Sequence, residues 1–117
     1  MKLTHRTVAR IQILTFSGNL QHQDIAHITQ QLHEIINHGS AYLLIDLSGL
    51  QHIDIQGLSV LLTARKLTQA QGGNVALLNP SKVAYSLLTL TYLHRIFIIY
   101  ADETVAIAEM TAPLRLT

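Results

Sequence analysis

Two aspartates are the residues whose type and spacing come closest to a reactive pair. Asp46 lies in an apolar run typical of a buried strand, and Asp54 lies in the segment that follows. Two carboxylates near one strand end could hold Mg²⁺ or accept a phosphoryl group. That chemistry needs an acidic cluster and a lysine partner, and the other acids are scattered. The alternative, which the sequence favours, is that Asp54 caps a helix by accepting hydrogen bonds from free N–H groups of its first turn.

Histidines are the second group that could do chemistry, and their spacing argues against a metal site. Four of the seven lie on or beside one predicted helix, at positions 22, 27, 33 and 38. Their spacings are 5, 6 and 5 residues, whereas helical metal ligands stand three or four residues apart. A solvent-exposed helix face explains these histidines better.

A glycine-rich loop that binds phosphate follows a strand and precedes a helix, whereas Gly72 and Gly73 follow a predicted helix and precede a predicted strand. The sequence therefore predicts a non-enzymatic protein without a metal or a cofactor.

The composition is that of a folded, weakly charged domain. Of 117 residues, 49% are hydrophobic and 13% are charged, and the net charge is +1. A disordered chain carries more charge, and a protein that binds nucleic acid through bulk charge carries an excess of Lys and Arg. The absence of cysteine excludes a disulfide scaffold and a thiol nucleophile. No apolar stretch is long enough to span a membrane and no signal peptide is visible, so we expect a cytoplasmic protein without direct membrane insertion.

Hydrophobic periodicity places these residues on alternating strands and helices. Apolar residues at helical spacing predict a helix over 24–38, and alternation predicts a strand over 8–16. Helices between strands imply an α/β fold, here a mixed sheet of four to five strands packed against about four helices. We expect one domain over residues 1–117, with its core at 8–110 and a loose tail at 111–117. The remaining elements are strands 2–7, 42–47, 75–78 and 96–100, a turn at 48–50, and helices at 55–71, from Asn79-Pro80 onward, and at 102–110.

The middle of the chain carries a set of motifs that resembles the STAS domain family, named for sulfate transporters and anti-sigma factor antagonists. Residues 44–50 read LIDLSGL and residues 53–62 read IDIQGLSVLL. The family has an apolar strand ending in Asp-Leu-Ser-Gly, then Asp-Ser-Ser/Thr-Gly-Leu and a helix. QGGNVALLNP at 71–80, LHRIF at 93–97 and GNL at 18–20 resemble further family motifs in the same order. The resemblance therefore implies a single STAS-like domain.

The same resemblance implies a function. Bacterial members bind a serine kinase that is also an anti-sigma factor, and a phosphoryl group on the Ser after the conserved Asp abolishes binding. A phosphoserine adds about −1.5 to −2 charges at the start of the helix. In this sequence Ile55 and Gln56 occupy both hydroxyl positions, and neither accepts a phosphoryl group. The resemblance thus predicts an anti-sigma factor antagonist-like module that is not switched at the family position.

The predicted partner-binding residues surround that position. Ser59, one helical turn further on, and Ser48, on the preceding loop, are the remaining hydroxyls. Tyr92 replaces a family Gly, at a place where a left-handed backbone costs a larger residue about 1 kcal/mol. The predicted partner-binding set is Gln21, Ser48, Asp54, Ile55, Gln56, Gly57 and Ser59.

Three interpretations of the partner remain open from the residues. The leading one is a kinase-like anti-sigma factor bound through residues 48–54 and the start of the second helix. A second is a component of a membrane transport system, for example for lipids, with this chain as its STAS-type subunit or regulator. A third is a phosphoryl-accepting, receiver-like domain that uses Asp54 and Asp46. Low charge and apolar composition are also compatible with a homodimer.

Overall fold

A five-stranded mixed sheet forms the centre of the computed structural model, which describes residues 1–112. The strands lie side by side in chain order, β1 antiparallel to β2 and the others parallel. The predicted fold class is confirmed. The strands are β1 Lys2–Val8, β2 Ile11–Leu20, β3 Tyr42–Ile53, β4 Asn74–Leu78 and β5 Ile98–Tyr100, and the helices are η1 His22–Asp24, α1 Ile25–Asn37, α2 Leu58–Ala70, α3 Lys82–Leu90, η2 Leu93–Arg95 and α4 Glu103–Thr111.

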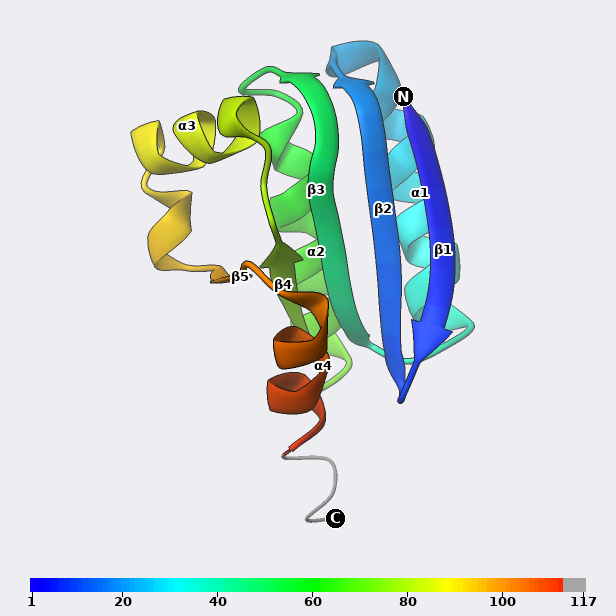
Figure 1. Cartoon of the computed structure of the whole chain (residues 1–117). Coiled ribbons are helices and arrows are strands. Elements are labelled where there is room, and N and C mark those ends of the chain that lie inside the picture. The colour runs from blue at the N-terminus through cyan, green and yellow to red at the C-terminus, as the bar shows by residue number, and fades with distance from the viewer. Residues whose placement is uncertain (113–117) are drawn as a thin grey trace.

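Helices cover the two faces of the sheet unequally. Figure 1 shows α1 and α2 packed behind β2 and β3, and α4 in front of the sheet near its lower end. Residues Leu43, Ile45 and Leu47 of β3 face the larger core with α1 and α2, whereas Leu44 faces the smaller core under α4. No helix within the described part of the chain is long and apolar enough to cross a membrane. Thr111, placed in the predicted loose tail, is a buried residue of α4, and 113–117 lie outside the described residues.

The predicted turn at residues 48–50 is wrong, because β3 continues through it to Ile53. The neighbouring strand, predicted over 8–16, begins and ends later than predicted, since Val8 belongs to β1 and β2 runs to Leu20, where it pairs with Ile53. Two register shifts interrupt this ladder. They space the core residues Leu47, Leu50 and Ile53 three apart, so the period-two signal of a strand disappears. The ladder hydrogen bonds outweigh the turn preference of Ser48 and Gly49.

Other elements begin later than their sequence signals predict. The predicted helix 55–71 begins at Leu58, since residues 55–57 form a turn. Pro80 precedes the third helix instead of lying in its first turn; Ser81 is the cap, and its Oγ accepts a hydrogen bond from the Ala84 N–H at 3.3 Å. The last strand is shorter than predicted because η2 and the buried Phe97 come before it.

Tyr92 adopts the left-handed backbone that its position after α3 requires. Its φ is 60° and ψ 14°, and its side chain is 63% exposed. The Arg95 guanidinium carbon lies 5.1 Å from the centre of the Tyr92 ring, within reach of a cation–π interaction. A bulky side chain in this conformation strains the backbone.

Comparing Tyr92→Gly with Tyr92→Ala isolates that strain. Both variants lose the ring, but only glycine adopts a positive φ without steric cost. We expect Tyr92→Gly to exceed Tyr92→Ala in free energy of unfolding by about 1 kcal/mol. Urea denaturation followed by circular dichroism measures the difference. Equal stabilities would show that the turn relaxes to a negative φ.

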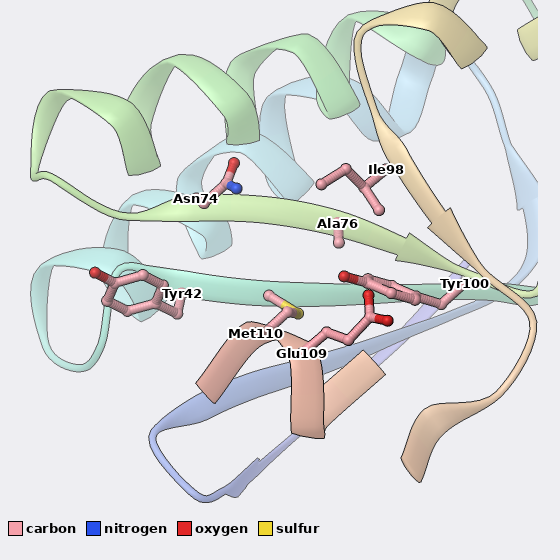
Figure 2. A pocket seen from close by; sticks show the side chains of 7 residues that line it. All are labelled: Tyr42, Asn74, Ala76, Ile98, Tyr100, Glu109 and Met110. Carbon is pink, nitrogen blue, oxygen red and sulfur yellow. The ribbon is translucent and has the colours of Figure 1, made fainter. Parts of the chain in front are cut away.

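Between α4 and the edge strand β5 the fold leaves a pocket of about 210 Å³. Figure 2 shows Tyr100 and Glu109 pointing toward one another at one end and Tyr42 at the other. Ala76 and Met110 line the space between them. Burial raises the pKa of the Tyr100 phenol, and so do its hydrogen bond to Glu109 and the negative charge there. The ion pair of Arg6 with Glu103 connects the first turn of α4 to the other edge strand, β1.

The Tyr100 environment predicts a loss of stability at alkaline pH. The unfolded state releases the phenol proton near its ordinary pKa of 10.0, whereas the folded state retains it. The free energy of unfolding therefore falls as pH rises above about 10. In Glu109→Gln we expect a smaller decrease in the free energy of unfolding, since the negative charge that raises the Tyr100 pKa is removed. Urea denaturation across this pH range measures both, and the Tyr100→Phe control separates this phenol from the other three tyrosines. An unchanged slope in Tyr100→Phe would contradict the assignment.

Candidate protein-interaction site

The site is built where the carboxyl ends of β2 and β3 lead into η1 and α2. The Asp54 N–H donates to the Leu20 carbonyl at 3.4 Å, so the two strands stay paired up to their last residues. The Gln21 N–H donates to the Asp24 carboxylate at 3.0 Å. The sheet ladder and these bonds together bring Gln21 and Asp54, far apart in sequence, to one end of the molecule.

Asp54 is a local cap, as expected, but since Gly57 is the N-cap of α2, Asp54 caps the turn at residues 55–57 and not the first turn of the helix. Its Oδ1 accepts a hydrogen bond from the Gly57 N–H at 2.7 Å, and its carbonyl accepts from the Leu58 N–H at 3.3 Å. Asp46 lies eight residues earlier along extended chain, about 25 Å away. The two acids therefore do not form a pair, and a receiver-like site that uses both is wrong. Within residues 1–112 no three His, Asp or Glu side chains are grouped so that they could hold a metal ion.

Gly57 is a packing residue and not a surface residue. A Cβ at this position would lie 2.8 Å from the Leu20 carbonyl oxygen and 3.1 Å from Ile53 Cγ1. Gly57 thus allows the start of α2 to approach the end of β2. A large substitution here would displace backbone, so it tests folding as much as binding.

Four residues of the predicted set are exposed: Ser48 on β3, and Ile55, Gln56 and Ser59, which follow Asp54 in the turn and the first turn of α2. Ile55 is 71% exposed, although it is a large apolar residue. Gln56 and Ser59 are also exposed, and Ser59 lies in the first turn of α2. We call these three residues the α2 surface. None of its three side chains carries a formal charge. The nearest carboxylate in sequence, that of Asp54, is half-buried and accepts a backbone hydrogen bond.

Ser48 lies outside this surface. It belongs to β3 and not to a loop, and it stands six residues before Asp54, about 20 Å along the strand. Its hydroxyl donates to Asp46 Oδ1 at 2.7 Å. Asp46 follows Ile45 and precedes Leu47, both in the larger core, so its side chain lies on the opposite face of the sheet.

Sequence reasoning missed an open groove beside the site. It has a volume of about 340 Å³ and runs between the end of β3 and helix α3. Val83, Leu87 and Leu90 of α3 recur at helical spacing along it, in addition to the buried stripe of Ala84 and Leu88. This second row of apolar residues on α3 is the sequence pattern from which the groove could have been predicted. The groove is lined by His52, Ile53, Lys82, Val83, Ser86, Leu87 and Leu90.

Known proteins share both the sequence pattern and this architecture. The sequence model of the STAS domain matches residues 2–106. An anti-sigma F factor antagonist of Paenibacillus polymyxa is 30% identical over 101 residues, 86% of each chain.

Solved structures agree with this match. The crystal structure of the Thermotoga maritima protein TM1081 superposes with a TM-score of 0.85 at 27% identity, covering 92% of this chain and 93% of that one. SpoIIAA, an anti-sigma factor antagonist in its unphosphorylated form, superposes with a TM-score of 0.80 at 22% identity, over 92% and 95% of the two chains. The chain is therefore a member of the STAS domain family, similar to the non-catalytic anti-sigma factor antagonists.

Proposed function

We propose that this protein binds a kinase-like anti-sigma factor in the cytoplasm through the α2 surface. The exposure of Ile55 is the observation that carries the proposal. Ile55, 71% exposed in the turn before α2, belongs to neither hydrophobic core. Apolar groups gain about 25 cal/mol per Å² on transfer from water to a protein interface. Ile55 is thus a suitable central contact for a partner, with Gln56 and Ser59 beside it.

We further propose that the interaction is not switched by phosphorylation at the family position. Neither Ile55 nor Gln56 has a hydroxyl group, and the α2 surface has no formal charge. A phosphoserine at the start of α2 would place about −1.5 to −2 charges at the interface. Binding the partner would then remove water from that charge, which opposes the interaction. Without that group, the binding state of this chain depends on its concentration and on the partner.

Ile55→Arg tests the binding surface better than a substitution of the buried Gly57. Exposed substitutions usually alter stability by less than about 0.5 kcal/mol, so the fold is retained. We expect the variant to lose its partner by at least about tenfold, as for a central interface residue. Pull-downs from the native lysate, followed by mass spectrometry, compare it with the wild type.

Val105→Arg is the matched control, because Val105 is also an exposed aliphatic residue but lies on α4. Equal recovery with both variants would contradict the α2 surface. A transport ATPase or membrane subunit in place of the kinase-like protein would move the function to transport.

Restoring a hydroxyl tests the absence of the switch. We expect wild-type protein incubated with the partner kinase and ATP to gain no phosphoryl group by intact mass. Ile55→Ser is expected to gain one and then to release the partner, since the negative charge opposes docking. A phosphoryl group on the wild type that disappears in Ser59→Ala would show that the switch has moved one turn along α2, and would contradict this proposal.

A further inference from the structure

The distribution of charge divides the chain into two parts. Residues 55–101 contain no Asp or Glu but include Arg65, Lys66, Lys82 and Arg95, a net charge of +4. The rest of the chain has the other four Lys and Arg and all seven acids, a net charge of −3, and the two parts sum to the overall +1. One part of this weakly charged protein is therefore uniformly basic, and it includes α3 and η2. Such asymmetry favours binding of an acidic partner.

Exposed apolar side chains gather in the same part of the chain. Figure 1 shows α3 and η2 next to one another at one edge of the molecule, above β5. Among the residues described, nine large hydrophobic side chains are exposed, and six of them belong to α3, to the residues directly before and after η2, and to β5. Contiguous exposed apolar area marks interaction sites more often than isolated residues do. The six are Val83, Tyr85, Leu90, Tyr92, Ile96 and Ile98.

Tyr92 provides an independent observation, since its strained backbone holds an exposed ring. Arg95 lies against that ring at 5.1 Å, and His94 stacks on it with 6.3 Å between ring centres. A strained backbone at an exposed aromatic residue is a reason to expect a function there. Tyr and Arg, like Trp, are enriched at the energetic centre of interfaces, because they combine a large apolar area with a polar group.

The groove along α3 gives the surface a shape. Val83 and Leu90 line it from one side, and Lys82 stands at the start of the same helix. An apolar groove with a lysine on its lining, continued along the same edge by Arg95 on the Tyr92 ring, is complementary to a helix with one apolar face and acidic residues beside it.

We propose that Lys82, Val83, Leu90, Tyr92, Arg95 and Ile96, the α3–η2 surface, dock an acidic amphipathic helix of a protein partner. The surface has only two fixed positive charges, whereas clusters of four to eight bind anionic membranes. The inference does not depend on the α2 surface, with which it shares no residue.

Synthetic peptides of about 18 residues test the partner chemistry. One has leucines at helical spacing with glutamates on the other positions, and the second has lysines in place of every glutamate. We expect the acidic peptide to bind the full chain at least about tenfold more tightly, with an affinity that falls as salt rises from about 0.05 to 0.5 M. Isothermal titration calorimetry measures the affinities, and amide shifts in NMR spectra locate the contact. Equal affinity for both peptides, or binding only to phosphatidylglycerol vesicles, would overturn the proposal.

Two variants of Tyr92 separate binding from folding. Tyr92→Gly and Tyr92→Ala differ in backbone strain but both remove the ring, so each should bind the acidic peptide about tenfold more weakly, whatever its stability. Arg95→Glu should reverse the preference between the two peptides. Val105→Ser and Ile55→Arg should bind as the wild type does. A loss in Ile55→Arg would place the peptide on the α2 surface instead, and full affinity in both Tyr92 variants would overturn the assignment.

Discussion

The pairing of β2 with β3 along almost their entire length is the constraint on which the rest of the structure depends. β3 carries core residues on both faces, so it fixes α1 and α2 behind the sheet and α4 in front of it. Just beyond the last residue of β3, the Asp54 N–H donates to the Leu20 carbonyl, where the turn into α2 begins. Gly57 allows that turn to press against Leu20, so the position of Ile55 follows from backbone geometry.

This rigid base explains how an apolar residue can be exposed without loosening the fold. The Asp54 carboxylate holds the Gly57 N–H, and the core begins again at Leu58 and Val60. Between these anchored positions, Ile55, Gln56 and Ser59 are exposed to solvent or a partner. A preorganised turn loses little conformational entropy when it binds, which favours affinity.

Charge and apolar exposure distinguish the α3 edge from the rest of the molecule. The acid-free stretch from 55 to 101 supplies both α2 and α3, yet the exposed aromatic and aliphatic residues concentrate on α3, on either side of η2, and on β5. The left-handed Tyr92 contributes to this edge at a cost in stability of about 1 kcal/mol. The protein thus presents two surfaces of different chemistry, one uncharged and one basic.

The sequence by itself determined the element order, the α/β class and the role of Asp54 as a local hydrogen-bond acceptor for the backbone that follows it. These depend on local signals such as periodicity, capping residues and motif spacing. Only the tertiary structure decided that residues 48–53 extend β3, since the register shifts remove the alternation that marks a strand. It also separated Ser48 and Asp46 from Asp54, buried Gly57, and formed the groove beside α3. Each of these depends on which segments pair across the sheet, and no single stretch of sequence encodes that.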